Sequence, residues 1–236
     1  MKNKVVIFGV GDFARVASVY LTKDSPYEIV AFTANQRYIQ ETELLNHKVV
    51  PFERLEDLYP PDQYAMFVAV GFSRVNKARA ELYHLCKSKG YELISYINSK
   101  ATYWSDIEVG DNCFIFENNV IQPFVKIGND VTIWSGNHIG HDASIGDHCF
   151  IASHAVISGN VNIGPYCFIG VNATISDKVI VAPECFIGAG AVILRNTKER
   201  GVYIAQPTKL SPVTSSELEE LRSQEVDTKG DDFGST

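Results

Sequence analysis

An aliphatic residue returns at every sixth position from Val109 to Ile193 without interruption. A period of six matches neither the 3.6-residue repeat of an α-helix nor the two-residue alternation of a strand, so it indicates an internal structural repeat. Each unit supplies one short strand and one turn, and three units close a triangular coil of 18 residues. The pattern therefore predicts a parallel β-helix. The positions in register are Val109, Ile115, Ile121, Ile127, Ile133, Ile139, Ile145, Ile151, Ile157, Ile163, Ile169, Ile175, Val181, Ile187 and Ile193.

Columns of like residues recur at the 18-residue spacing. Stacked strands lie ~4.8 Å apart, so residues in one column pile above one another. We expect two such columns to line the interior, beside the isoleucines. Glycine often follows the aliphatic residue, where we expect it to permit a tight corner. The two columns are Cys113, Val131, Cys149, Cys167, Cys185 and Phe114, Thr132, Phe150, Phe168, Phe186.

Composition narrows the class of protein. The chain has 236 residues, 45% of them hydrophobic, and a net charge of −7, which argues against a nucleic-acid or anionic-membrane surface as main partner. Four of the five cysteines fall in the small-residue column, so they are interpreted as apolar filler in a reduced core. The N-terminus lacks an apolar segment of signal or membrane length, so we expect a cytoplasmic protein without membrane insertion.

The N-terminal part alternates strand and helix patterns, which predicts a small parallel α/β domain. Its turn Gly9-Val10-Gly11-Asp12-Phe13-Ala14 joins a strand to a helix, the arrangement that binds a phosphate on backbone N–H groups. No acidic residue follows about 20 residues later to hold a ribose, because Thr33-Ala34-Asn35 stands there. A nucleotide or nucleotide sugar is therefore favoured over a nicotinamide cofactor, and a turn that binds nothing is the alternative. Strands are expected at 4–8, 28–33, 49–52, 65–71 and 91–97, and helices from the end of the glycine turn at Ala14 to about Leu21 and at 73–89.

Four of the six histidines lie inside the repeat, at His138, His141, His148 and His154. His141 is followed by Asp142, and a carboxylate beside an imidazole can fix its tautomer and support it as a general base. The repeat places this pair on a corner of the coil, where a groove can reach it. A solvated corner histidine without a role is the alternative.

The repeat resembles the left-handed β-helix of hexapeptide-repeat acyltransferases, which assemble as trimers with acyl-CoA between neighbouring prisms. The run from His141 to Asn172 is similar to the active-site region of bacterial nucleotide-amino-sugar N-acetyltransferases of the sialic-acid O-acetyltransferase-like family. Their motif is present here as His141, Asp142, Ile145-Gly146 and Gly159-Asn160. The resemblance implies that His141 is the catalytic base, Asp142 its acidic partner, and Gly159, one coil further on, the donor to the oxyanion.

The same resemblance suggests the binding residues. Acetyl-CoA is expected at Phe150, Val171, Ala189 and Lys209, the last in a closing segment, 202–209, that resembles the family's own. The nucleotide sugar is expected at Gly9, Gly11, Asp12, Phe13, Thr33, Ala34 and Gly71. The chain departs from the family at Asp12, Phe13, Thr33-Ala34 and Phe150, which leaves the sugar and its nucleotide open.

The predicted organisation is a Rossmann-like nucleotide-sugar-binding domain at 1–98, a left-handed β-helix acyltransferase domain at 99–210 and an acidic tail at 211–236, with a short helix near 216–222. The predicted function is acetyl-CoA-dependent, metal-free N-acetylation of a nucleotide-linked amino sugar, in surface polysaccharide biosynthesis, by a homotrimer with active sites between subunits. Alternatives are a sugar O-acyltransferase, a carbonic-anhydrase-like metalloenzyme using the repeat histidines, and a scaffold that binds a nucleotide sugar without catalysis.

Overall fold

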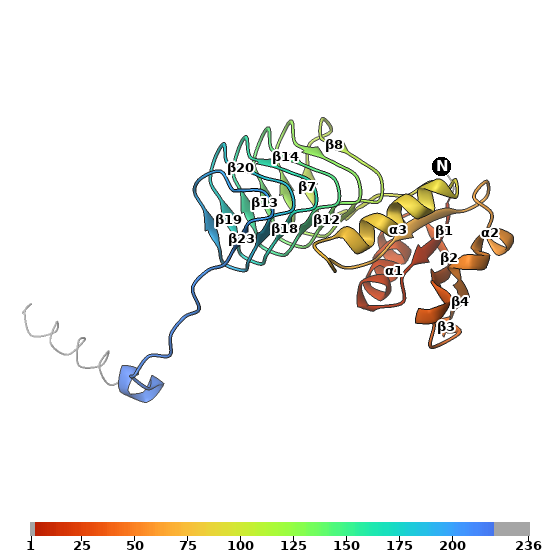
Figure 1. The fold of residues 1–236 in the computed structure, drawn as a ribbon, viewed down its shortest axis with the longest axis horizontal. Coiled ribbons are helices and arrows are strands. Elements are labelled where there is room, and N and C mark those ends of the chain that lie inside the picture. Colours follow the sequence, from red (N-terminus) through yellow and green to blue (C-terminus); the bar gives the residue numbers. More distant parts are fainter. Residues whose placement is uncertain (1–2, 220–236) are drawn as a thin grey trace, which may run out of the picture. The chain divides into compact units, whose positions relative to one another are not determined.

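The computed structural model describes residues 3–219, and the chain divides into two compact units, residues 1–205 and 206–236. In the second unit a helix begins at residue 215, and the expected helix residues beyond 219 lie outside the described part. The first unit contains the α/β region followed by the left-handed parallel β-helix, so the predicted fold class is confirmed (Figure 1). The division of this unit at residue 98 stays a prediction.

The α/β region is one five-stranded sheet in the order β3-β4-β2-β1-β5. Its pairs are parallel except for the short antiparallel pair of β3 with β4. Helices form where apolar residues recur at helical spacing, as in α1, which buries Ala14, Ala17 and Leu21. The elements are β1 (Lys4–Phe8), α1 (Asp12–Asp24), β2 (Glu28–Ala34), η1 (Gln36–Tyr38), β3 (Glu43–Leu44), β4 (His47–Pro51), η2 (Phe52–Arg54), α2 (Leu55–Leu58), β5 (Ala65–Val68) and α3 (Lys77–Ser88).

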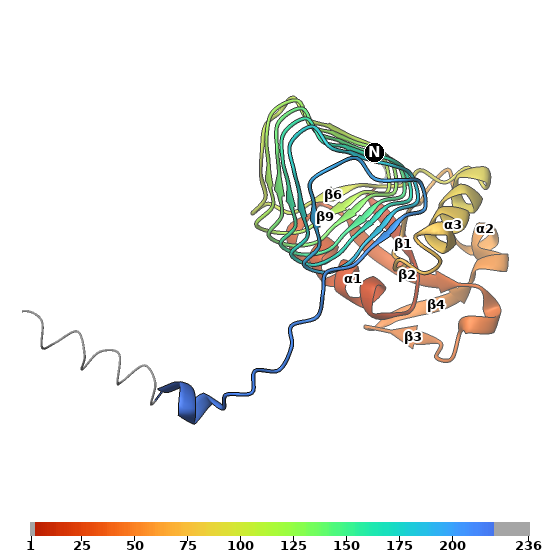
Figure 2. The same ribbon diagram turned by 60° about the vertical axis from the view of Figure 1, so that its left-hand side comes forward.

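The β-helix is a prism whose three faces are parallel sheets, here called the β9, β10 and β11 sheets after one member of each (Figure 2). The β9 sheet contains β6 (Tyr96–Ile97), β9 (Phe114–Ile115), β12 (Thr132–Ile133), β15 (Phe150–Ile151), β18 (Phe168–Ile169), β21 (Phe186–Ile187) and β23 (Val202–Tyr203). The β10 sheet contains β7 (Thr102–Tyr103), β10 (Val120–Ile121), β13 (His138–Ile139), β16 (Val156–Ile157), β19 (Thr174–Ile175) and β22 (Val192–Ile193). The β11 sheet contains β8 (Glu108–Val109), β11 (Lys126–Ile127), β14 (Ser144–Ile145), β17 (Asn162–Ile163) and β20 (Ile180–Val181).

Three corners join these sheets. The first corner follows each strand of the β9 sheet, the second follows each strand of the β10 sheet, and the third follows each strand of the β11 sheet. Partners in neighbouring coils are 18 residues apart, as for His138 with Val156. The sequence register therefore specifies which residues stand above one another at each corner.

The prism core consists of the repeat's aliphatic residues and the column of cysteines. Burial raises the pKa of the Cys113 thiol in this core to about 12, and it does the same for Cys86, which lies in the core of the α/β region. Both thiols are therefore neutral at physiological pH. The prediction that the column of phenylalanines lines the interior of the prism is wrong. Successive strand residues point to opposite sides, so each two-residue strand that turns its isoleucine inward turns its phenylalanine outward. Phe114 accordingly packs with the α/β core, and Phe150 and Phe168 form a separate cluster.

The prediction that glycine is needed for the backbone conformation of the corners is also wrong. Positive φ occurs three places after the repeat's aliphatic residue, as at Asn112 (52°) and Asp142 (57°), and asparagine or aspartate tolerates this conformation well. The glycine directly after the aliphatic residue instead lets two coils approach closely. A Cβ on Gly140 would lie 2.5 Å from the Gly159 nitrogen, and one on Gly170 would lie 2.6 Å from the Ala189 nitrogen.

The prism begins earlier than the uninterrupted repeat indicates. The strand expected at 91–97 divides: Leu93 bridges to Met66 of the α/β sheet, whereas Tyr96–Ile97 pairs with β9. Ile97 and Tyr103 continue the six-residue register backwards from Val109. The tyrosine hides this continuation from a search for aliphatic residues alone.

Aromatic packing joins the α/β region to the β9 sheet. Phe13 of α1 lies 5.8 Å from Phe114 and 6.1 Å from Trp134, measured between ring centroids. Phe116 stacks on Trp134 at 4.5 Å. Rings from both halves therefore form one continuous hydrophobic core.

A buried polar network ties α3 to the third corner. The Arg79 Nε donates to Asp130 Oδ1 at 3.0 Å, and both side chains are almost fully buried. The other oxygen of Asp130 lies 2.8 Å from His148 Nδ1, and Asn112 donates to Oδ1 at 2.7 Å. Arg79 also donates to the carbonyls of Asp130, His148 and Cys149. These contacts fix α3 against the prism in one orientation.

None of the helices among the described residues is long and apolar enough to cross a membrane.

We expect Asp130→Asn to destabilise the protein, because asparagine keeps the left-handed backbone but leaves the Arg79 charge buried without a counter-ion. Breaking one side of a buried ion pair costs about 3–5 kcal/mol, which corresponds to a fall in Tm on the order of 10 °C for a chain of this size. Thermal unfolding followed by circular dichroism measures it. Glu108→Gln is the control, since its pair with Lys126 is exposed and should shift stability by less than about 1 kcal/mol. Equal Tm values for the two variants would contradict the role of Asp130 as the counter-ion of Arg79.

Candidate active site

The His141–Asp142 pair lies at the second corner, directly after β13. The His141 Nδ1 is 2.8 Å from Asp142 Oδ2, and the two side chains are 54% and 50% exposed. The left-handed conformation of Asp142 turns the chain at this point, and the carboxylate meets the neighbouring ring. The predicted pair is therefore formed, with its ring accessible from outside.

Neighbouring coils hold the backbone of this pair. The His141 N–H donates to Gln122 Oε1 at 2.9 Å, and the His141 carbonyl accepts from the Asn160 N–H at 2.8 Å. The Asp142 N–H donates to the Pro123 carbonyl at 3.1 Å. Within the part of the chain that the structure describes, His141 Nε2 has no hydrogen-bond partner. The ring is thus oriented through Nδ1 and free to exchange a proton at Nε2.

Gly159 lies one coil beyond His141, as the register predicts. A Cβ added to Gly159 would lie 2.7 Å from His141 Nε2, so this nitrogen lies against the space that a side chain would fill. Among residues 3–219 the Gly159 N–H donates no hydrogen bond. An unpaired backbone N–H beside a free imidazole nitrogen is an arrangement that can hold a developing oxyanion.

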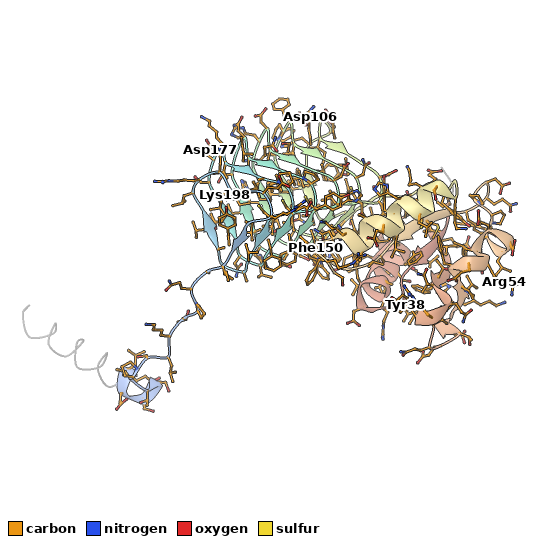
Figure 3. All side chains as sticks on the ribbon, viewed as in Figure 1. Tyr38, Arg54, Asp106, Phe150, Asp177 and Lys198 are labelled. Atoms are coloured by element: carbon orange, nitrogen blue, oxygen red, sulfur yellow. The ribbon has the colours of Figure 1, made fainter. Side chains whose placement is uncertain are left out.

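The residues expected to bind acetyl-CoA fall into three environments. Val171 and Ala189 are both exposed at the first corner, one coil apart, so they can line a groove. Phe150 is buried on the outer side of the β9 sheet, with its ring 5.6 Å from Phe168 and 5.1 Å from Phe72 (Figure 3). Lys209 is exposed in the second unit. The cofactor role of all four stays a prediction, and burial leaves Phe150 the least available.

A cavity of about 850 Å³ opens beside the glycine turn of the α/β region. Gly9, Gly11 and Ala34, all expected to contact the nucleotide, line it. Gly9 has a φ of 133°, and a Cβ there would lie 2.5 Å from the Ala69 carbonyl oxygen, so only glycine fits between β1 and β5. The turn that resembles a phosphate-binding loop therefore borders a cavity of ligand size.

The other expected nucleotide contacts do not line this cavity. Phe13 belongs to the aromatic core, and Thr33 is buried with its hydroxyl donating to the Val50 carbonyl at 2.9 Å. Asp12 is exposed in the first turn of α1, where a negative charge stabilises the helix, and Gly71 borders open space. A substrate contact at these four positions stays a prediction without support from the geometry.

Sequence reasoning missed the charged lining of the cavity. Arg15, Arg37 and Arg74 border it, together with Tyr38 and three acidic residues, Glu41, Glu43 and Glu81. Arg74 forms an ion pair with Glu81, whereas Arg37 lies over the Tyr38 ring at 4.7 Å. The arginines come from α1, η1 and the turn before α3, so no short motif contains them. Their position beside the glycine turn fits them to bind phosphate oxygens.

The repeat histidines occupy different environments. His148 is buried against Asp130 at the third corner, His141 is exposed at the second, and His154 lies beside Gly136 at the first. Within residues 3–219 no group of three His, Cys, Asp or Glu side chains is placed to bind a metal ion.

Comparisons with known proteins agree with this architecture. Residues 106–137, 125–159 and 160–195 match the family model "Bacterial transferase hexapeptide (six repeats)". The prism is built of hexapeptide repeats. A search of the curated proteins finds no match.

Several solved structures share the fold. A histidine-to-asparagine variant of perosamine N-acetyltransferase from Caulobacter crescentus, in complex with CoA and GDP-perosamine, matches with a TM-score of 0.79 and 24% identity, covering 89% of this chain and 97% of that chain. The acetyltransferase domain of PglB from Neisseria gonorrhoeae FA1090 matches with a TM-score of 0.75 and 24% identity, covering 85% of this chain and 96% of that chain. WeeI from Acinetobacter baumannii AYE matches with a TM-score of 0.75 and 18% identity, covering 88% of this chain and 99% of that chain. At these identities the likeness establishes the fold.

We expect Gly159→Ala and Gly140→Ala to have different effects. The new Cβ at residue 159 meets the end of the His141 side chain, which can rotate, so the ring should be displaced with little change in Tm. The new Cβ at residue 140 meets backbone atoms of Ser158 and Gly159, which cannot move without opening the coils, so the Tm should fall. Thermal unfolding and crystal structures of both variants measure these outcomes. An unmoved His141 ring in Gly159→Ala would contradict the assigned geometry.

Proposed function

We propose that the protein transfers the acetyl group of acetyl-CoA to the amino group of a nucleotide-linked amino sugar. The observation that carries this proposal is the free Nε2 of His141 beside the unpaired N–H of Gly159, one coil apart. The cavity at the glycine turn supports a nucleotide-linked substrate. Proteins of the same fold have been solved with CoA and GDP-perosamine and with acetyl coenzyme A. No step in this proposal requires a metal ion.

The chemistry is a direct attack of nitrogen on the thioester carbon. His141 accepts the proton through Nε2, while Asp142 holds the ring through Nδ1 and stabilises the imidazolium. The Gly159 N–H donates to the carbonyl oxygen as it becomes negative. Collapse of the tetrahedral intermediate breaks the carbon–sulfur bond, and CoA leaves as the thiol.

The placement of the parts supports an assembly of several copies. His141 is at the second corner, the expected acetyl-CoA residues Val171 and Ala189 are at the first, and the β10 sheet separates these corners. The α/β region packs on the β9 sheet and the third corner. One chain therefore holds the base, the groove and the nucleotide cavity on different parts of its surface. A homotrimer in which a second copy brings its groove to His141 resolves this separation.

We propose a cytoplasmic location for this reaction. All five cysteines are free and buried, which suits a compartment that keeps thiols reduced.

We expect His141→Ala to lower the rate of CoA thiol release by roughly 10²–10⁴-fold, the usual contribution of a general base. The assay uses acetyl-CoA with a panel of UDP-, dTDP- and GDP-linked amino sugars. His84→Ala is the control, because His84 is an exposed histidine on α3, which packs at the third corner, away from His141. Near-normal turnover by His141→Ala would remove the residue from the role of base.

We expect Arg37→Ala and Arg15→Ala each to weaken binding of a nucleoside diphosphate about tenfold, the usual effect of losing one charge-assisted hydrogen bond. Isothermal titration calorimetry with UDP, dTDP and GDP measures the dissociation constants. Arg54→Ala is the matched control, since Arg54 is an exposed arginine of η2 outside the cavity lining (Figure 3). If all three variants bind like the parent protein, the cavity is not the nucleotide site.

A further inference from the structure

A second carboxylate, that of Asp177, lies near the reactive nitrogen of His141. Asp177 follows Gly159 by one coil, so His141, Gly159 and Asp177 form one column at the second corner. A Cβ on Gly159 would lie 2.7 Å from His141 Nε2 and 3.1 Å from Asp177 Oδ1. Both side chains therefore lean towards the same recess, which exists because the middle coil has no side chain there.

His141 Nε2 and Asp177 Oδ1 are close enough to bind one atom between them. The two distances leave at most about 6 Å between Nε2 and Oδ1, which is close to the span of two hydrogen bonds of about 2.9 Å that meet at a shared atom. A protonated amine that lies outward of Gly159, clear of its backbone, can reach the carboxylate and the imidazole at once.

The other charged groups leave Oδ1 available. Lys178 lies 3.9 Å from the opposite oxygen, Oδ2, and both members of this pair are exposed, so it holds Asp177 weakly. Asp142 occupies the far side of the His141 ring, at Nδ1. Arg195 follows Asp177 in the same column, one coil further on. Asp177 thus provides a carboxylate on the Nε2 side of the ring.

We infer that Asp177 binds the ammonium group of the acceptor and holds it against His141. This rests on the proposed function and deepens it, because it assigns a residue that selects a cationic amine over a sugar hydroxyl. An ammonium donates charge-assisted hydrogen bonds to a carboxylate, whereas a hydroxyl donates one hydrogen bond without a charge.

The proton balance follows from this geometry. The ammonium, paired with Asp177 Oδ1, transfers one proton to His141 Nε2, and the nitrogen lone pair then attacks the thioester carbon. The carbon–nitrogen bond forms and the carbon–sulfur bond breaks. One proton leaves with CoA as the thiol and the other passes to solvent, so an ammonium and acetyl-CoA give an amide, CoA and one proton.

Asp177→Asn tests the inference, since it keeps the shape of the side chain and removes its charge. The probe is whichever UDP-, dTDP- or GDP-linked amino sugar the parent protein acetylates, compared with the same nucleotide sugar carrying a hydroxyl in place of the amine. We expect KM for the amino sugar to rise about tenfold, with KM for acetyl-CoA and the affinity for the hydroxyl analogue unchanged.

The matched control is Asp106→Asn, an exposed aspartate at the same corner two coils before Asp142 (Figure 3). This variant should leave KM for the amino sugar, KM for acetyl-CoA and the affinity for the hydroxyl analogue unchanged. An active parent protein whose Asp177→Asn variant keeps its KM, or shifts amine and hydroxyl ligands equally, overturns the inference and leaves the proposed function standing. Thiol release only with hydroxyl acceptors, or with none, overturns the proposed function, and the role of Asp177 falls with it.

Discussion

The hydrogen bonding between successive coils governs the rest of this structure. Gly140 donates to the Ile157 carbonyl at 2.8 Å, and Asn160 donates to the His141 carbonyl at the same distance. Coils joined in this way cannot slide, so residues 18 positions apart must lie above one another. Glycine at positions such as 140 permits the approach, and a left-handed residue two places later closes the corner. The distances around His141 are consequences of this register rather than of a flexible loop.

The sequence predicted the parts of the site that depend on the register alone. The aliphatic period places Gly159 next to His141, and the adjacent aspartate meets the ring as expected. Side-chain direction was predicted less well: a period of six does not say which of two strand residues points inward, so the phenylalanine column was assigned to the wrong side. The cavity arginines depend on three elements meeting in space, which spacing along the chain does not encode.

The two halves of the first unit are joined by interactions of different kinds. Stacked rings make a broad hydrophobic contact, and such contacts tolerate small rotations. The Arg79–Asp130 pair does not, because a buried charge that loses its partner costs several kcal/mol. The α/β region is therefore fixed on the β9 sheet and the third corner, and the second corner, with His141, stays accessible. This division of the prism surface supports the proposal that a second copy completes the site.

The two carboxylates near His141 differ in what they can do for an acceptor. Asp142 contacts Nδ1, so it orients the ring and stabilises its charge whatever the acceptor is. Asp177 lies on the Nε2 side, where the proposed mechanism places the acceptor. A hydroxyl acceptor develops negative charge as it loses its proton, and two unit negative charges about 4 Å apart repel by ~1 kcal/mol in water and ~4 kcal/mol at an effective dielectric constant of 20. An ammonium acceptor begins positive and becomes neutral, so the same carboxylate attracts it on binding and opposes no charge that develops on nitrogen. The position of Asp177 therefore favours transfer to nitrogen over transfer to oxygen.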